Sequence, residues 1–177
     1  NYGDERRTEI IPVVSDFSMG DMIAEEEVVL TITHQGYIKR TALNTYRTQR
    51  RGGRGVQGAG SKEEDFVEHL FIANTHNYML FFTDRGKCFW LKVYDIPQGG
   101  RATRGRAIVN LIGCDPNERV EAFVSVSEFK DDEFIVMATK KGVVKKTVLS
   151  AYGKPRKGGI YAIEIRDDDQ LIEARIT

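Results

Sequence analysis

Three segments of the chain share one pattern of hydrophobic and polar positions. Each has an apolar run, a threonine, two polar residues and a glycine, and then a second run that carries lysines. The three segments are "VVLTITHQGYIKRTAL" (28–43), "MLFFTDRGKCFWLKVY" (79–94) and "FIVMATKKGVVKKTVL" (134–149). The runs are rich in Val, Ile, Phe, Tyr and Thr, which favour β-strands. The pattern therefore predicts three β-hairpins.

The glycine of each segment marks the predicted turn. Gly36, Gly86 and Gly142 each stand third in a short hairpin loop. A type I turn needs a residue with left-handed backbone angles at that position, and glycine adopts them without a Cβ clash.

Each hairpin is followed by the same two features. The first is a stretch rich in Gly, Arg and Lys ("QRRGGRG", "QGGRATRG", "GKPRKGG"), and the second is a further strand with an acidic residue. These acids, Glu68, Glu121 and Glu173, are 53 and 52 residues apart, and the turn glycines are 50 and 56 apart. A period near 50 with about four strands per unit is typical of propeller blades. The predicted fold is all-β, a propeller-like array of four-stranded antiparallel blades.

The 177 residues fit one repeat domain, 1–177, with approximate blades at 10–75, 76–128 and 129–177. A short helical turn is expected in "SMGDMIAEEE" (18–27), and no segment longer than about ten residues has a helical period. Neighbouring blades must stack to form one core. Because propellers typically have ~4–8 blades, we expect these three to belong to a larger circular array. The start at Asn1 rather than Met also suggests an excised piece.

Charge is segregated although the net charge is zero. Residues 35–62, 85–106 and 140–159 hold 20 of the 26 Lys and Arg and only one acid, Asp95. The rest of the chain holds 6 basic and 25 acidic residues. An electric field depends on where the charges lie, so three basic blocks in an acidic body suggest a polyanionic partner.

Other chemistry is sparse. Cys88 and Cys114 are too few for a disulfide framework, which favours a reducing cytoplasm and a role as small buried hydrophobes. No apolar run approaches ~18 residues, so no membrane partner is expected. The three histidines are scattered, and the runs of acids at 25–27, 63–65 and 167–169 fit solvated turns. We therefore predict no catalytic residue and no metal ligand.

The first basic block contains "TYRTQRRGGRGVQGAG" (45–60), with four arginines and no acid. "GRGVQG" matches the dinucleotide fingerprint in form, but no βαβ unit surrounds it. A disordered RGG-type RNA binder would repeat the triplet many times. A plain solvated loop explains poorly why four like charges stay together. Arginine forks match phosphate oxygens, and glycines let backbone N–H groups approach them, so a DNA-gripping arm fits best.

The segment "QRRGGRG" is identical in form to the box that marks the C-terminal domain of the DNA gyrase A subunit. The preceding "GYIKRTALNTYR" and the opening "DERRTEII" also resemble the start of that domain. The resemblance covers the whole chain. In this family an intact box distinguishes gyrase from topoisomerase IV.

This resemblance implies a β-pinwheel, a ring of about six four-stranded blades, of which the chain matches roughly the first three. It implies wrapping of double-stranded DNA around a basic outer edge, without sequence preference and with one handedness. In the holoenzyme, with the gyrase B subunit, that wrap supports ATP-dependent negative supercoiling. The catalytic groups, ATP and Mg²⁺ belong to other parts of gyrase, so no cofactor is expected in this chain. An array of three blades would also leave one apolar blade face exposed.

The resemblance also implies the DNA-binding residues. The box residues are Gln49, Arg50, Arg51, Gly52, Gly53, Arg54 and Gly55. The rim residues, which are Lys and Arg expected at the outer edge of the blades, are Lys39, Arg40, Arg47, Arg85, Lys87, Lys92, Arg101, Arg104, Arg106, Lys140, Lys141, Lys145, Lys146, Lys154, Arg156 and Lys157. About half of the rim residues are expected to touch DNA.

Two other classes of function remain open. A protein-binding propeller would show an apolar patch, with basic residues scattered among acids. An enzyme on a propeller scaffold would need convergent carboxylates, a histidine or a metal site in its loops. The separation of charge argues against the first class, and the lack of such a constellation argues against the second.

Overall fold

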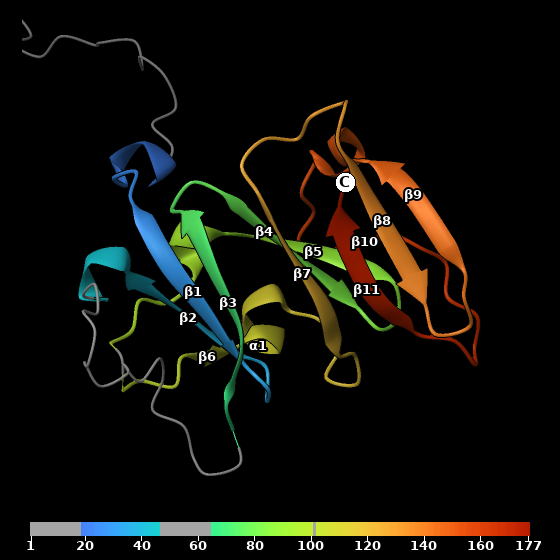
Figure 1. Cartoon of the computed structure of the whole chain (residues 1–177), viewed down its shortest axis with the longest axis horizontal. Coiled ribbons are helices and arrows are strands. Elements are labelled where there is room, and N and C mark those ends of the chain that lie inside the picture. Colours follow the sequence, from blue (N-terminus) through green and yellow to red (C-terminus); the bar gives the residue numbers. More distant parts are fainter. Residues whose placement is uncertain (1–18, 47–64, 101) are drawn as a thin grey trace, which may run out of the picture.

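The computed structural model describes residues 19–46, 65–100 and 102–177, and these form an all-β molecule with a few short helical turns (Figure 1). The strands are β1 (Glu27–Thr33), β2 (Tyr37–Ala42), β3 (Val67–Asn74), β4 (Tyr78–Thr83), β5 (Lys87–Lys92), β6 (Arg106–Ala107), β7 (Val120–Val126), β8 (Phe134–Thr139), β9 (Val144–Val148), β10 (Ile160–Tyr161) and β11 (Leu171–Ile176). The helical turns are the 3₁₀ segments η1 (Met19–Met22), η2 (Leu43–Thr45), η3 (Val93–Asp95) and η4 (Leu149–Tyr152), and the α-helical α1 (Ile108–Ile112). The short helical turn predicted within 18–27 is confirmed as η1.

The three predicted hairpins are confirmed as β1–β2, β4–β5 and β8–β9, each antiparallel. Gly36, Gly86 and Gly142 have φ of 77°, 79° and 85°, as the turn requires. The N–H of each glycine donates to the carbonyl of the threonine three residues earlier, at 2.8–3.0 Å. The hydroxyl of the same threonine accepts the N–H four residues on, at 3.1–3.2 Å. The Thr-x-x-Gly signature is thus the hydrogen-bonding plan of the turn.

The sheets do not coincide with the sequence repeats. The first sheet has the order β3-β1-β2-β6 and the second β10-β5-β4-β7. Strand β6 follows the second hairpin along the chain but pairs antiparallel with β2 of the first. Strand β10 follows the third hairpin and pairs with β5 of the second. The second and third repeats therefore each contribute three strands to their own sheet and a short fourth strand to the preceding one, whereas the sequence predicted four strands per unit.

The third sheet has the order β11-β8-β9. Among the described strands none pairs with the outer edge of β9, the position that β6 and β10 occupy on the other two sheets. Val143 and Val144 at the start of this edge are 46% and 65% exposed.

The sheets stack in chain order, as the colour sequence in Figure 1 shows, and two hydrophobic cores lie between them. Strand β4 belongs to both. Its Met79 and Phe81 point to the core shared with the first sheet, and Leu80 and Phe82 point to the core shared with the third. All four are fully buried. Because both faces of this strand are covered, its sequence is a continuous apolar run instead of an alternating one.

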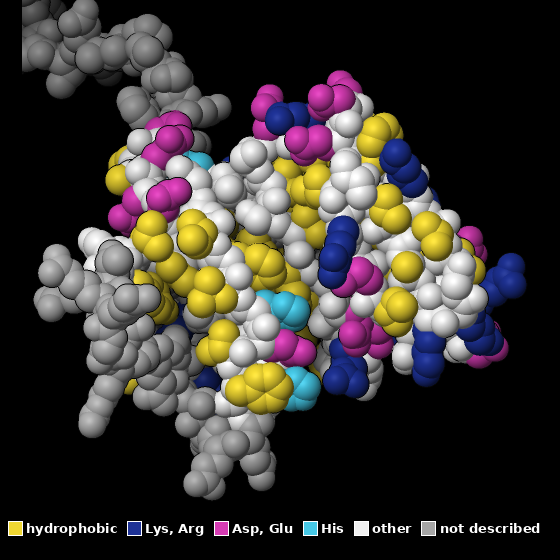
Figure 2. All heavy atoms as spheres, in the orientation of Figure 1, with side chains coloured by type: hydrophobic (Ala, Val, Ile, Leu, Met, Phe, Trp, Pro, Cys, Tyr) yellow, Lys and Arg dark blue, Asp and Glu magenta, His cyan; other side chains and the backbone are white. Residues whose placement is uncertain are grey.

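The outward face of the first sheet is uncovered in the described part of the chain. Leu70 and Ile72 on β3 are 56% and 59% exposed. Phe66 and Met22, close to the two ends of the strand, are exposed as well. Hydrophobic side chains gather over β3 in Figure 2. An exposed apolar face was expected for an array of three blades.

Gly105 tests the packing of the exchanged strand. Its φ is +91°, and an added Cβ would lie 2.4 Å from the carbonyl oxygen of Ile38 on β2. We expect Gly105→Ala to lower the free energy of unfolding by about 1–3 kcal/mol, because the residue is strained and the strand is pushed away. Gly100→Ala is the matched control in the same loop, where a Cβ meets nothing within 4 Å. Urea denaturation measures both, and equal stability of the two variants would contradict the packing of β6.

Candidate nucleic-acid interface

The described rim residues fall into three groups: cations held within the fold, exposed cations that still have a contact, and exposed cations without a side-chain partner. The hairpin strands contribute to the first two groups, whereas turns, a loop and the exchanged strand β6 supply the third. The distinction matters because a cation already held by a carboxylate or by carbonyl oxygens loses those contacts if it turns to a phosphate.

Lys39 is a structural residue, not a surface one. It is 1% exposed, and its Nζ donates to the carbonyl oxygens of Gly100 and Thr103, both at 2.8 Å. Burial lowers the pKa of Lys39. Its predicted contact with phosphate is therefore incompatible with its position, since the ammonium faces the segment that leads to β6.

Several other predicted cations are engaged at partly buried positions. Arg40 Nε donates to the carbonyl of Ile96 at 2.7 Å. Lys92 Nζ donates to the carbonyl of His76 at 2.7 Å and lies 3.7 Å from the ring centroid of Tyr78. Burial lowers the pKa of Lys92, and the charge of Asp95 partly offsets this.

Lys87 is held by a buried acid. Its Nζ lies 2.5 Å from Oε1 of Glu118, which is 7% exposed. This hydrogen bond is the main cause that raises the pKa of Lys87. A cation paired at such a site contributes little to the field outside.

Three cations of the third hairpin have contacts within the fold but stay exposed. Lys145 donates to the carbonyl of Ala162 at 2.5 Å, Lys146 Nζ lies 4.0 Å from the ring centroid of Phe134, and Lys141 pairs with Asp168. Exposed contacts of this kind are worth little in water, so these side chains can turn to another anion.

Six rim residues are exposed and have no side-chain hydrogen bond or ion pair within the described part of the chain. We call them the free cations. They are Arg85, Arg106, Lys140, Lys154, Arg156 and Lys157. Arg85 and Lys140 lie in the β4–β5 and β8–β9 turns, Arg106 begins the exchanged strand β6, and the other three lie in the loop after η4. Lys and Arg side chains stand out at the edge of the third sheet in Figure 2.

The box Gln49–Gly55 lies outside the described residues, as do Arg47 and Arg101. Their predicted roles therefore stay predictions. The described chain ends at Tyr46 on one side of that segment and resumes at Asp65 on the other.

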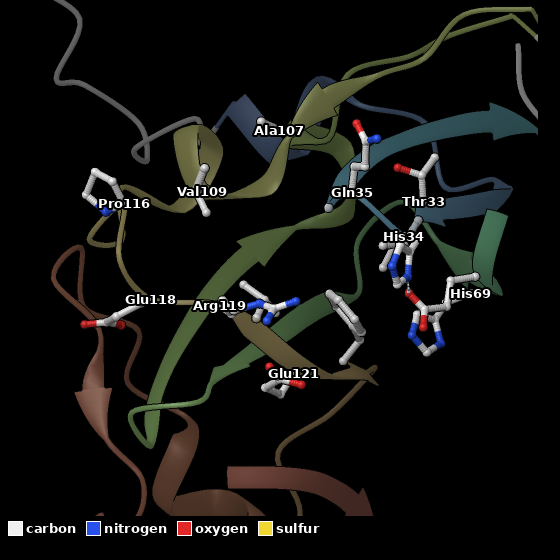
Figure 3. Close-up of a pocket in the computed structure, with 15 residues that line it drawn as sticks. Thr33, His34, Gln35, His69, Ala107, Val109, Pro116, Glu118, Arg119 and Glu121 are labelled. Carbon is white, nitrogen blue, oxygen red and sulfur yellow. Dashed lines mark hydrogen bonds and ion pairs between the residues drawn. The ribbon is translucent and has the colours of Figure 1, made fainter. Parts of the chain in front are cut away.

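A cleft of about 620 Å³ lies between the first and second sheets, at their turn ends (Figure 3). It has a mixed lining. His34 Nδ1 lies 3.2 Å from Glu68 Oε2, and Arg119 lies between Glu118 and Glu121. Burial raises the pKa of Glu121. Because three carboxylates line the cleft, it is a poor site for phosphate.

Arg119 and Arg166 are exposed cations that the sequence did not single out. Each has acidic neighbours in the sequence, so neither lies within the three basic blocks from which the rim residues were predicted. Both line clefts that contain several carboxylates, and the free cation Arg85 lines the same cleft as Arg166.

Metal-ligating side chains are not clustered in the described residues. These residues contain no group of three or more His, Cys, Asp or Glu placed to hold a metal ion. Cys88 is buried, and burial raises the pKa of its thiol, so it is not a nucleophile. No helix in this part of the chain is long and apolar enough to cross a membrane.

The family model described as "DNA gyrase C-terminal domain, beta-propeller" matches the chain three times, at 27–74, 77–127 and 133–177. The three matches follow the three hairpins and the strands β3, β7 and β11. The chain belongs to the DNA gyrase A C-terminal domain family. The resemblance seen in the sequence is thereby confirmed, and so is the propeller-like fold.

Curated members of this family are similar over nearly the whole chain. The DNA gyrase A protein of Clostridium acetobutylicum is 52% identical over 99% of the chain, and that of Haemophilus influenzae is 48% identical over 99%. The chain covers 21% and 20% of those proteins, so it spans about a fifth of their length.

Solved structures of the family have the same fold. The C-terminal domain of a DNA topoisomerase IV matches with a TM-score of 0.74 and 29% identity, over 88% of this chain and 47% of that one. The C-terminal domain of a DNA gyrase A matches with a TM-score of 0.66 and 24% identity, over 86% and 48%. The chain thus covers about half of each solved domain.

Lys39→Met tests the structural role of this lysine. The change keeps a long apolar stem but removes the lysine donor from the carbonyl of Thr103 and from that of Gly100, which retains the N–H and Oγ1 of Thr103 as donors. We expect a loss of about 1–3 kcal/mol in the free energy of unfolding, measured by urea denaturation. Lys145→Met, at the equivalent position of the third hairpin but exposed, should change it by about 0.5 kcal/mol or less. A Lys39→Met variant as stable as the unchanged chain would return Lys39 to the candidate phosphate ligands.

Proposed function

We propose that this chain binds double-stranded DNA through the free cations and the box, and bends the duplex along the outer edges of its blades. The observation that carries the proposal is the set of six exposed cations that have no side-chain partner among the described residues, in the second and third repeats of a gyrase A C-terminal domain fold. They lie in turns and loops and on an exchanged strand, all positions that a long rigid partner can reach from outside.

The chemistry of these residues favours phosphate over bases. The free cations are long side chains that meet a polyanion at its charged backbone, which carries no sequence information. Binding is therefore indifferent to DNA sequence. Bending a site of about 20–30 bp by 40–90° costs on the order of 1–6 kcal/mol, and phosphate contacts spread over several blades offset this cost.

In the intact gyrase, by this proposal, the wrap has one handedness and presents a second DNA segment to the strand-passage gate. The chain then acts in the cytoplasm, together with the gyrase B subunit, as one part of the gyrase A protein. ATP and Mg²⁺ act in other parts of that enzyme, and this chain supplies the DNA path that makes the ATP-driven reaction introduce negative supercoils.

The salt dependence of DNA binding tests the proposal. If about eight phosphates are neutralised, log K should fall with log salt at a slope near −7. Replacing Lys154, Arg156 and Lys157 together by Gln should weaken binding and flatten the slope by about 2.7, or 0.9 for each lost contact. Fluorescence anisotropy with two unrelated duplexes at several salt concentrations measures both quantities. Arg50, Arg51 and Arg54 changed together to Ala should have a similar effect.

Lys130→Gln is the matched control for this series, because Lys130 is exposed but pairs with Glu133 outside the basic blocks. It should leave the slope unchanged. Absence of binding at low salt, or equal effects of all variants, would instead favour a protein partner at the rim.

A second experiment tests the role of the box in the activities of the holoenzyme. Removal of Gln49–Gly55 from a gyrase A protein that carries this domain should spare DNA cleavage and relaxation and abolish negative supercoiling, because the reaction loses the handed wrap. Agarose gel assays with and without ATP distinguish the two activities, with Lys130→Gln as the control. A box-deleted gyrase that still supercoils would refute this role.

A further inference from the structure

Arg104 differs from the free cations, although it lies in the same basic block as Arg106. Its Nε donates to Oδ2 of Asp65 at 3.3 Å, and its Nη2 donates to Oε1 of Gln35. Its guanidinium carbon lies 3.8 Å from the ring centroid of Tyr37. The guanidinium is thus held on three sides by the first repeat, while its backbone belongs to the second.

Asp65 is a buried acid whose two carboxylate oxygens have different partners. Its side chain is fully buried, and its Oδ1 accepts the backbone N–H of Gln35 at 3.0 Å while Oδ2 faces Arg104. One carboxylate therefore ties the β1–β2 turn to the segment that leads to β6. A buried carboxylate needs such partners, because the loss of one would leave its charge uncompensated.

The other two repeats place buried acids at equivalent positions but use them differently. Glu118 pairs with Lys87 of its own repeat. Asp169 accepts backbone N–H groups of Lys141 and Gln170, at 3.0 and 2.9 Å. In the described part of the chain, Asp65 is the acid of this set that captures a cation from the following repeat.

The segment held in this way is the second basic loop, which is residues 97–105 without Arg101, a residue outside the described part of the chain. Lys39 binds two of its carbonyls, Thr41 Oγ1 donates to Gly99 O at 3.0 Å, and Arg104 is the last side chain anchored before Arg106. Asp65 directly follows, in sequence, the segment that holds the box. The Asp65–Arg104 ion pair, called the tie below, therefore connects a residue just after the first basic block to the loop of the second.

We infer that Arg104 is a positioning residue and not a phosphate ligand: with Asp65 it fixes the second basic loop on the first sheet and so sets where Arg106 meets DNA. This inference rests on the proposed function. It assigns opposite roles to two arginines that stand two residues apart, and it makes a buried acid a requirement for binding a polyanion.

Asp65→Asn gives the sharpest test. A role of charge alone and a role in positioning the loop predict opposite changes in DNA affinity for this variant. Removing a negative charge should tighten DNA binding if only the charge matters. If the tie matters, binding should weaken about three- to tenfold, since the freed loop must be ordered again on the DNA. Asparagine keeps an oxygen for the Gln35 N–H, so the turn is retained, and circular dichroism verifies the fold.

The arginine variants complete the design. Arg104→Gln should weaken binding by a similar factor with the salt slope unchanged, and the double variant with Asp65→Asn should be no worse than either single one. Arg106→Gln should flatten the slope by about 0.9. Arg104→Lys should not restore binding, because an ammonium cannot bridge Asp65 and Gln35 and cover Tyr37 at once. A flatter slope for Arg104→Gln, or full binding by Arg104→Lys, would overturn the inference.

Hydrogen exchange separates this inference from the proposed function, since it needs no DNA. The N–H groups of Gly99 and Ile108, bonded to the carbonyls of Arg40 and Gly36, should exchange several-fold faster in Arg104→Gln and Asp65→Asn. They should be unaffected in Arg106→Gln. Unchanged exchange in the first two variants would refute the tie even if the chain binds DNA, and failure of the unchanged chain to bind DNA would refute only the proposed function.

Discussion

The architecture depends on the exchange of strands between repeats. A blade of three strands has an open outer edge, and the next repeat closes it with two residues, Arg106–Ala107 on β2 and Ile160–Tyr161 on β5. Close approach is needed at each crossing, where Gly105 and Gly159 have positive φ and leave no room for a Cβ. The same crossings carry the basic stretches across the outer edge of the preceding sheet. Fold and charge distribution therefore have one origin.

This exchange explains why charge in the basic blocks has two uses. A segment that crosses to another sheet brings unpaired carbonyls with it, and lysine or arginine donors from the receiving strand satisfy them. Lys39 on β2 does so for the second basic loop, and Arg40 on β2 does so for Ile96 just before it. The cations left over face outward, and they make up the surface available to a polyanion. A count of basic residues in the sequence overstates that surface because it includes both kinds.

Much of the fold could be predicted from the sequence, because it depends on local signals. The Thr-x-x-Gly turns and the apolar runs predicted the hairpins, and the repeat of these signals predicted a propeller-like array. Strands β6 and β10 could not be found in this way, since two residues have no period and their pairing is set by partners far along the chain. The burial of Lys39 was hidden for the same reason, as its acceptors, Gly100 and Thr103, lie 61 and 64 residues away. Arg104 and Arg106 could not be distinguished in the sequence, because the partner of Arg104, Asp65, lies 39 residues away along the chain.

The proposed function requires that the outer edges of the blades bend duplex DNA with one handedness. Its most direct test is to close nicked circular DNA with ligase in the presence of increasing amounts of the chain, remove the protein, and measure the distribution of linking numbers on a gel. We expect a shift of one sign that grows with the amount of bound chain and is lost when Lys154, Arg156 and Lys157 are changed to Gln. A distribution that stays centred where it began, with the chain fully bound, would show that the rim binds DNA without wrapping it.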